Sequence, residues 1–359
     1  MNLTKEIFDL SVVSQGNKAR LAKLMEKAAK GENLTLAVIG GSITAGSSSS
    51  VQDKCYASLT AKWWRDNFPQ ANFTFHNMGI GATTSVLGVH RLENDILAKK
   101  PDFLIVEFAV NDDDTMYPYY ENLIRRVMLE EKETAVIMLF MTTESGWNRQ
   151  EQQIAIGEAY GLPMISYHNV IRKLIDTNEI TWRDVSPDDV HPNDEGHSVC
   201  ASLLASYLDG VKAEYANLCK CVPAVPEKAL YGERYMNAKL YTASTLEADS
   251  NVDWVVDSGM NFYHLNTGWK TENAGAELTF ETEFKEVNIC YRKMISDPEI
   301  GNAKVFVDGN EVDLLEGAFP GGWGDYFSVK TSFKADEITK HTLTIESTGK
   351  FYILAILLS

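Results

Sequence analysis

Four short polar segments of the chain could together perform nucleophilic catalysis. GGSIT (40–44) places Ser42 directly after the apolar run LTLAVI, where a tight strand-to-helix turn would expose its hydroxyl and glycines tolerate the sharp backbone path. NMGIGATT (77–84) and AVND (109–112) also follow predicted strands, and DDVHPN (188–193) comes just before a helical pattern. These positions supply a nucleophile, a histidine, and acidic and amide groups.

A serine hydroxyl is a weak nucleophile until a base takes its proton, and histidine is the most frequent base. His191 stands in a turn before a helix, with Asp188 three residues and Asp189 two residues before it. Either carboxylate could hold the imidazole in the tautomer that accepts the Ser42 proton. The chemistry predicted is acyl transfer from an ester, which requires neither a metal nor an organic cofactor.

Each segment also has a simpler interpretation. GGS could be a plain turn, Asn111 a helix cap and DxxH a surface turn. Gly41 and Gly46 have P-loop spacing, but Ser47 stands where that motif requires Lys, and this segment contains no G-x-G-x-x-G fingerprint. Phosphate and dinucleotide binding are therefore disfavoured.

In combination, the four segments resemble the conserved blocks of the SGNH (GDSL-like) hydrolase superfamily. They occur in the family's order, and the resemblance spans about residues 34–210. The first block reads Gly-Gly-Ser where many members have Gly-Asp-Ser, and the third has Ala109 where many have Gly. Neither change replaces a reacting group.

The resemblance implies a role for each block. Ser42 would be the nucleophile, and the family's D-x-x-H spacing assigns Asp188 and His191 as its triad partners. The Ser42 N–H, the Asn111 side-chain amide and the Ala82 N–H would stabilise the oxyanion. The family's donor glycine falls on Ala82, and Gly81 is the alternative donor.

The elements that must position these residues follow from hydrophobic periodicity. Near-continuous apolar runs predict strands that are covered on both faces, at 34–41, 73–77, 103–110, 135–141 and 163–167. Helical patterns lie between them and after Asn193. This alternation predicts an α/β fold with a doubly wound parallel sheet, flavodoxin-like and three-layered, whose working residues gather at the carboxyl ends of the strands.

The pattern changes after Cys221, and this change divides the chain. Short β-rich runs such as AELTFETEF, VNICYRKM and YFSVKTSF replace the helical pattern, and Asp308-Gly309 is a strong hairpin signal. We expect a catalytic domain at 1–216, a linker at 217–230 and a β-sandwich or jelly-roll domain at 231–359 that is similar to a carbohydrate-binding module.

Composition limits the partners and the location of the protein. The net charge of −17 and the pI of about 4.9 disfavour nucleic acid and anionic membranes as partners, whereas a neutral oligosaccharide meets no such barrier. The start, MNLTKEIFDL, does not resemble a signal peptide, and the five Cys residues show no disulfide framework. Cys219 and Cys221 lack a second Cys/His pair for a metal. We expect a cytoplasmic protein, with an oligomer possible.

Aromatic side chains offer clues to the substrate. Glu144 and Trp147 follow the fourth strand, at the expected mouth of the cleft. In the β domain, Trp269, Trp323 and Tyr326 could contact sugar rings, although aromatic residues mostly fill β-sandwich cores. Trp254 and Tyr263 are further aromatic residues of the β domain.

The layout, with the hydrolase domain first and the β domain second, resembles intracellular carbohydrate esterases of family seventeen. That resemblance implies removal of 2-O-acetyl groups from manno-oligosaccharides. Alternatives are an acetyl-xylan esterase, an esterase for lipids, thioesters or other small acyl esters, and a non-catalytic carbohydrate-binding protein on a hydrolase scaffold.

Overall fold

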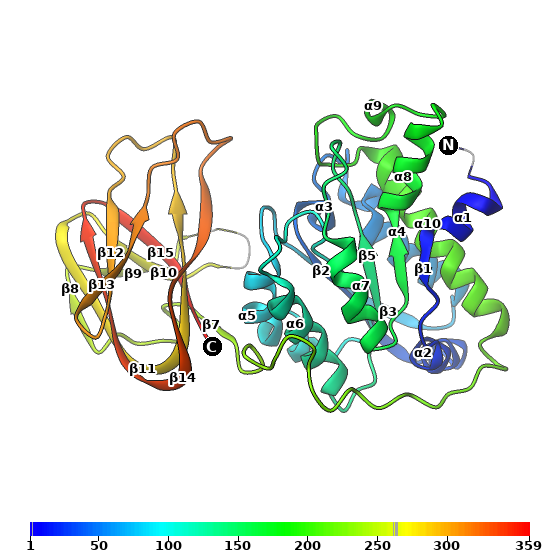
Figure 1. Ribbon diagram of the computed structural model, residues 1–359, viewed down its shortest axis with the longest axis horizontal. Coiled ribbons are helices and arrows are strands. Elements are labelled where there is room, and N and C mark those ends of the chain that lie inside the picture. Colours follow the sequence, from blue (N-terminus) through cyan, green and yellow to red (C-terminus); the bar gives the residue numbers. More distant parts are fainter. Residues whose placement is uncertain (2, 261, 263–264) are drawn as a thin grey trace. The chain divides into compact units, whose positions relative to one another are not determined.

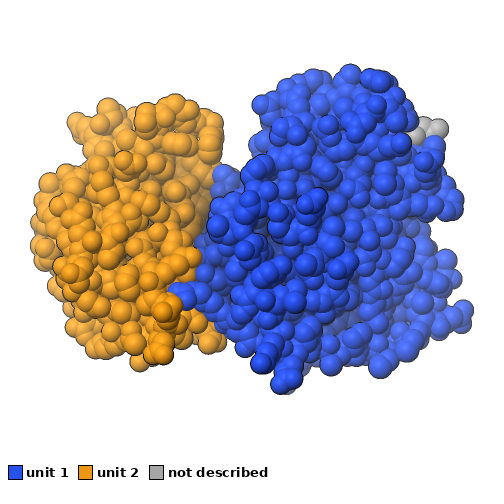
Figure 2. Space-filling model, in the orientation of Figure 1, with its two compact units in different colours: residues 1–236 blue, residues 237–359 orange. Residues whose placement is uncertain are grey.

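The computed structural model describes residues 1, 3–260, 262 and 265–359. Within these ranges the chain forms two compact units, unit 1 (residues 1–236) and unit 2 (residues 237–359), which are coloured separately in Figure 2. Tyr263 lies outside the described residues.

A mainly parallel sheet forms the centre of unit 1. In the described part of this unit, six strands lie in the order β1-β6-β5-β4-β2-β3 (Figure 1). The strands are β1 (Val12–Ser14), β2 (Asn33–Gly40), β3 (Asn72–Gly79), β4 (Phe103–Glu107), β5 (Ala135–Phe140) and β6 (Met164–Ser166). Strands β2 to β6 are parallel, and β1 pairs with β6 in the antiparallel direction. Every residue of β4 and β5 is buried, as the apolar runs predict.

Helices cover both faces of this sheet, so the predicted three-layer fold is confirmed (Figure 1). One face is covered by α1 (Lys5–Ser11), α2 (Ala19–Ala29), α4 (Tyr56–Asn67), α8 (Tyr167–Asp176) and α10 (Asp194–Glu214). The other is covered by α5 (Ser85–Asp95), α6 (Tyr117–Leu129) and α7 (Gln150–Ala159). The shorter helices are α3 (Ser42–Ala45), α9 (Trp182–Val185), η1 (Gln52–Lys54) and η2 (Leu97–Lys99). The sequence patterns did not predict α1, β1 and α8, because α1 and β1 are short and α8 begins directly after β6 without a loop.

Strand order decides where polar loops meet. β2 lies between β3 and β4, and the end of β2 at Gly40 is in register with Gly79 and Glu107. The chain leaves β2 toward β3 on one side, whereas β4 pairs on the other. Such a reversal of strand order opens a crevice at the carboxyl edge of a parallel sheet.

The predicted linker, 217–230, is anchored to unit 1. In this fully described segment the backbone forms no helix or strand, and polar groups near its end bind α6 instead. Glu121 accepts hydrogen bonds from the N–H groups of Leu230 and Tyr231, each at 2.7 Å. Arg125 donates to the carbonyl of Pro226 at 2.7 Å. The compact unit therefore continues to Met236. Among the described helices, none combines the length and the apolar content of a membrane span.

Unit 2 is an antiparallel β structure. Among its described residues, seven strands form a sheet in the order β13-β12-β14-β11-β15-β10-β9, and β7 and β8 pair with β15 and β11. The strands are β7 (Lys239–Tyr241), β8 (Ser250–Val252), β9 (Val255–Asp257), β10 (Gly268–Thr271), β11 (Ala274–Lys293), β12 (Asn302–Val307), β13 (Asn310–Glu316), β14 (Tyr326–Thr348) and β15 (Phe351–Leu358). The predicted hairpin at Asp308-Gly309 joins β12 to β13, and both residues have positive φ.

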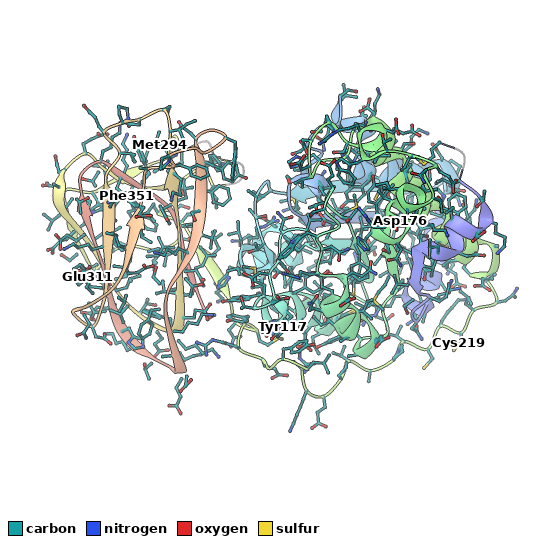
Figure 3. All side chains as sticks on the ribbon, turned by 45° about the horizontal axis from the view of Figure 1, so that its top comes forward. Tyr117, Asp176, Cys219, Met294, Glu311 and Phe351 are labelled. Carbon is teal, nitrogen blue, oxygen red and sulfur yellow. The ribbon has the colours of Figure 1, made fainter. Side chains whose placement is uncertain are left out.

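The long strands of unit 2 differ from the sequence prediction. AELTFETEF and VNICYRKM were expected to form two strands, but they form one strand, β11, which pairs along its length with β14. Irregularities in register after Phe284 and Val287 let this pair bend without ending, and Figure 1 shows both strands curving. The core of unit 2 contains Trp254, Trp269 and the fully buried Phe351, which is labelled in Figure 3.

Candidate active site

The turn after β2 places Ser42 at the carboxyl edge of the sheet. Ser42 is the first residue of α3, a single helical turn that ends at Gly46, where φ is 94°. The path is tight, because a Cβ on Gly40 would overlap the Thr44 hydroxyl and a Cβ on Gly41 would overlap the Asn111 side-chain oxygen. The two glycines therefore allow the turn to pack against its neighbours.

His191 and Asp188 lie beside this serine, although 149 positions separate Ser42 from His191. The Nε2 atom of His191 is 2.9 Å from the Ser42 Oγ, and its Nδ1 is 2.9 Å from Asp188 Oδ2. With the proton on Nδ1, the ring donates to Asp188 and leaves Nε2 to accept the serine proton. The structure thus brings Ser42, His191 and Asp188 into one chain of hydrogen bonds.

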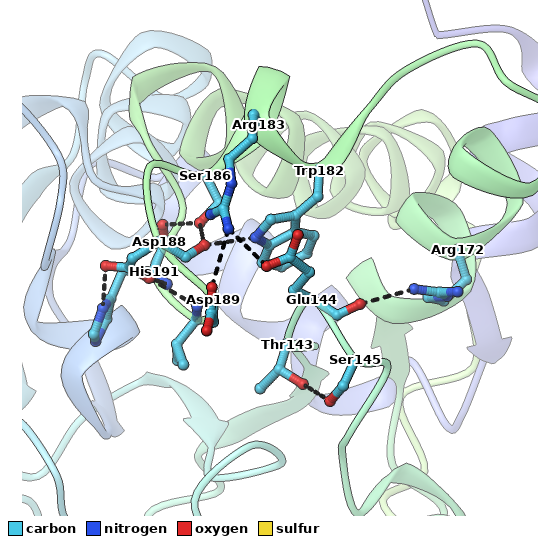
Figure 4. Close-up of polar contacts among 11 residues, drawn as sticks. Thr143, Glu144, Ser145, Arg172, Trp182, Arg183, Ser186, Asp188, Asp189 and His191 are labelled. Atoms are coloured by element: carbon cyan, nitrogen blue, oxygen red, sulfur yellow. Dashed lines mark hydrogen bonds and ion pairs between the residues drawn. The ribbon is translucent and has the colours of Figure 1, made fainter.

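Backbone and side-chain contacts fix the Asp188 loop (Figure 4). Asp188 Oδ1 accepts the N–H groups of Val190 and His191, each at 2.7 Å. Partial burial acts to raise the pKa of Asp188, but these donors and the imidazole together lower it below its usual value. The Asp188 carbonyl oxygen is 2.6 Å from Trp182 Nε1 and 2.7 Å from the Ser186 hydroxyl. The carboxylate is thereby held in an ionised form facing the ring.

Asp189, the other candidate partner of His191, has a different role. Its side chain is 80% exposed and pairs with Arg183 at 3.0 Å, which lowers the pKa of Asp189. Arg183 also pairs with Glu144 at 2.8 Å, and the Glu144 N–H donates to the Asp189 carbonyl at 2.8 Å (Figure 4). Arg183 and these two carboxylates therefore link the loop after β5 to the loop that carries His191.

Trp147 occupies the same loop after β5. Its side chain is 48% exposed, and the Arg149 guanidinium lies 3.8 Å from the ring centroid. The Arg149 N–H donates to the Ala109 carbonyl at 2.7 Å, while Glu144 binds the Asp189 backbone. The loop that carries Trp147 is thus tied to both the Asn111 loop and the His191 loop.

The two remaining polar loops flank Ser42. Asn111 packs directly against Gly41. In the loop after β3, the Ile80 N–H donates to the Gly40 carbonyl at 3.1 Å. Ala82 in this loop is exposed and has φ 47°, in the left-handed region, whereas Gly81 is buried and has no positive φ. Alanine adopts this conformation at a cost of about 1–2 kcal/mol. Ala82 therefore has the left-handed backbone that glycine favours, at the position where the family has a glycine.

Two buried carboxyl groups beside the site were not identified from the sequence. Glu107 and Asp112 lie at the end of β4 and in the loop after it, with 0% and 3% exposure. Burial raises the pKa of each to about 7. Asp112 accepts the Ser85 N–H at the start of α5, at 2.8 Å. An available signal was that Glu107 interrupts the otherwise apolar run FLIVEFAV.

The aromatic candidates of unit 2 separate into two groups. Trp269 is 2% exposed and packs edge-on against Phe280, so burial disfavours the expected sugar contact of this residue. Its place on β10 turns the ring into the core. Trp323 is 73% exposed and lies 4.9 Å from Phe319 and 5.8 Å from Tyr326, between ring centroids. Trp323 therefore presents free ring surface, with Tyr326 half-buried beside it.

The cysteines provide no cross-link. All five lie in the described part of the chain and are free thiols; Cys219 (labelled in Figure 3) and Cys221 are exposed. In the same described ranges, no group of three or more His, Cys, Asp and Glu side chains is arranged to hold a metal ion.

A doubly wound sheet with a serine, a histidine and a carboxylate in hydrogen-bond contact at its carboxyl edge has the arrangement of a serine hydrolase. Comparisons with known proteins agree. Residues 38–199 match the model of the GDSL-like Lipase/Acylhydrolase family. The structure is similar to a two-domain esterase (CEX) active on acetylated mannans, at 33% identity and a TM-score of 0.93, covering 98% of each chain.

The same esterase co-crystallised with mannopentaose matches at 33% identity and a TM-score of 0.91, covering 98% of this chain and 97% of that chain. Among curated protein sequences, no significant match was found. Because the similarity extends over nearly the whole chain, the protein belongs to the GDSL-like lipase/acylhydrolase family. It is a carboxylic ester hydrolase.

Proposed function

We propose that the protein removes O-acetyl groups from acetylated manno-oligosaccharides through an acetyl-enzyme on Ser42. The observation that carries the proposal is the hydrogen-bonded series Ser42–His191–Asp188, with both distances 2.9 Å. The similarity of both units to an esterase active on acetylated mannans supports the choice of substrate.

In the first half-reaction the Ser42 Oγ attacks the acetyl carbonyl carbon while His191 Nε2 takes the hydroxyl proton. Asp188 holds the imidazole in place and stabilises the imidazolium that forms. The tetrahedral intermediate then collapses. The carbon–oxygen bond to the sugar breaks, and His191 returns the proton to the departing sugar oxygen.

The oxyanion requires donors that are already oriented before the reaction. We assign the Ser42 N–H, the Ala82 N–H and the Asn111 Nδ2 to this role. The exposure and left-handed backbone of Ala82 favour it over the buried Gly81. The contact of Asn111 with Gly41 supports its place beside the nucleophile.

In the second half-reaction a water molecule replaces the sugar. His191 takes a proton from the water, the hydroxide attacks the acetyl carbon, and the bond to Ser42 Oγ breaks as His191 returns the proton to it. The products are acetate and free enzyme. These steps are carried entirely by side chains and backbone groups of this chain.

Substrate contacts are assigned to exposed aromatic side chains. Arg149 stacks on the Trp147 ring, and the ring's exposed surface is suited to a sugar at the edge of the crevice. Glu144 would bind sugar hydroxyls while paired with Arg183. We further assign unit 2 as a carbohydrate-binding module, in which Trp323 and Tyr326 contact the oligosaccharide.

We assign the catalytic domain to residues 1–216, to which the remainder of unit 1, residues 217–236, is attached.

The location proposed for the protein is the cytoplasm. All five cysteines, which belong to the described residues, are free, and this supports a reducing compartment. Cell fractionation with an antibody to the protein tests the assignment, because recovery in the culture medium or periplasm would contradict it.

The experiment that tests the reaction compares wild type with Ser42→Ala on acetylated mannan and xylan oligosaccharides, with acetate release followed by NMR. We expect release from mannan oligosaccharides by wild type and none by the variant. Equal or faster release from xylan oligosaccharides would favour an acetyl-xylan esterase. Cleavage of short nitrophenyl esters without release from any sugar would contradict the carbohydrate substrate and leave the triad intact.

A further inference from the structure

A carboxyl group that the proposed reaction does not use lies buried beneath the nucleophile turn. Glu107 is the last residue of β4, is 0% exposed, and stands opposite Gly40 in the pairing of β2 with β4. Fully buried glutamates are rare unless they are paired. The groups around this side chain therefore indicate what it does.

The contacts of Glu107 reach the turn on both sides of Ser42. The Thr44 hydroxyl donates to Glu107 Oε2 at 3.0 Å, and the Thr44 Oγ1 is also 2.7 Å from the Tyr56 hydroxyl. Burial raises the pKa of Glu107, and the nearby backbone N–H groups of Ala109 and Gly41 partly offset this rise by favouring the charged form. The other oxygen, Oε1, is buried and has no hydrogen-bond partner among the described residues.

These contacts connect two sources of the oxyanion donors. Gly41 directly precedes Ser42, whose N–H is one assigned donor, and Ala109 lies in the loop that carries Asn111, which is another. Donors of this kind must keep a fixed spacing, and a displacement of about 1 Å in an active site can cost about 100-fold in rate.

We propose that Glu107 is a positioning residue, whose buried carboxyl ties the nucleophile turn to the loop of Asn111 and so sets the spacing of the oxyanion donors. The inference rests on the proposed function, because it assumes ester hydrolysis at Ser42. Glu107 itself does not touch the reacting atoms.

The opposite end of β4 offers a matched control. Asp102, directly before the strand, is 6% exposed, accepts the Thr35 N–H at 2.8 Å and pairs with Lys132 at 2.9 Å. It is a buried, hydrogen-bonded carboxylate at the amino edge of the same sheet. A merely structural role for Glu107 would give Glu107→Gln and Asp102→Asn similar consequences.

The test measures kcat and KM on a short nitrophenyl ester, the inhibition constant of phenylboronic acid, and the thermal midpoint. Phenylboronic acid forms a tetrahedral adduct on a serine nucleophile, so its binding reports the oxyanion geometry. Glu107→Gln keeps the shape of the side chain but replaces one carboxyl oxygen by an NH2 group. This donor must point either toward the Thr44 hydroxyl or toward the Gly41 and Ala109 N–H groups.

We expect Glu107→Gln to lower kcat about 10- to 100-fold with KM within about twofold, and to weaken boronate binding by a similar factor. Thr44→Val, which removes one partner of the carboxyl, should shift both quantities in the same direction by a smaller factor. Asp102→Asn should change the thermal midpoint and leave kcat within about twofold.

The proposal is overturned if folded Glu107→Gln keeps kcat and boronate binding within twofold, or if Asp102→Asn loses as much activity. Should Glu107→Gln fail to fold, an unchanged kcat in Thr44→Val overturns it instead. Failure of the proposed function is recognised separately, because Ser42→Ala would then keep its esterase activity, or wild type would release no acetate from sugars.

Discussion

The two units differ in how far their candidate functional side chains are buried. At the carboxyl edge of the unit 1 sheet, polar groups are buried and interconnected, with Ser42 8%, Glu107 0% and Asp112 3% exposed. In unit 2 the tryptophans divide between a core that contains Trp269 and a surface that presents Trp323. Burial orients groups for chemistry, whereas exposure leaves ring surface for a ligand. Substitutions in unit 1 should therefore change kcat, and substitutions on the surface of unit 2 should change KM for large substrates.

The largest effect is expected at the pair of adjacent aspartates. Asp188→Asn keeps the shape but loses the carboxylate that holds the His191 tautomer, so kcat should fall by about 10⁴-fold. Asp189→Asn is the matched control and should keep kcat within about threefold, because Asp189 binds Arg183 and is 80% exposed. Steady-state kinetics on a nitrophenyl ester measure both. Equal losses in the two variants would contradict the assignment of Asp188.

A smaller loss is expected from Gly41→Ala. The added Cβ would overlap the Asn111 side chain and displace one oxyanion donor, so kcat should fall by about 100-fold. Gly210→Ala is the control, since Gly210 lies within α10 and a Cβ added there would meet no neighbouring atom within 4 Å. It should raise stability by about 0.5–1 kcal/mol without changing kcat. Full activity of Gly41→Ala would show that Asn111 is not held by this contact.

Stability should depend on pH through the buried carboxyl of Glu107 in unit 1. Burial raises the pKa of Glu107 from 4.5 to about 7, so the folded chain holds this proton more tightly than the unfolded chain. The associated stabilisation is complete below about pH 4.5 and is lost as pH rises through 7. As pH rises from 4.5 to 8, the free energy of unfolding of Glu107→Gln should increase relative to that of wild type by an amount on the order of 1–3 kcal/mol. Thermal midpoints across this range measure the gain, and parallel curves for the two proteins would refute it.

The smallest effect is expected at the surface of unit 2. Trp323→Ala removes exposed ring surface, so KM for acetylated oligosaccharides should rise by about fivefold, equivalent to roughly 1 kcal/mol. KM for a nitrophenyl ester should stay the same. Val256→Ala, at a residue that is 59% exposed, controls for loss of any surface side chain. If KM rose for both substrates, Trp323 would affect the reaction itself and not only the binding of oligosaccharides. The proposed difference between the two units would then be wrong.

Much of the fold could be predicted from local sequence patterns. The apolar runs that became β2, β4 and β5 are continuous because those strands are covered on both faces, and the fold class followed from their alternation with helices. The merger of two predicted strands into β11 was not predictable in this way. A β-bulge lets a strand bend without ending, and the sequence signal of a bulge resembles that of a break.

The candidate site divides in the same way. The sequence by itself determined which reacting groups exist and that each follows a strand or precedes a helix, because these are properties of neighbouring residues. The D-x-x-H spacing already favoured Asp188 over Asp189, and the structure places Asp188 Oδ2 2.9 Å from His191 Nδ1. Tertiary structure alone decided that Ala82 adopts φ 47°, and that Trp269 is buried while Trp323 is exposed. It also decided that Glu107 lies beneath Ser42. Contacts, burial and backbone strain depend on residues far apart in the chain, and only packing brings those residues together.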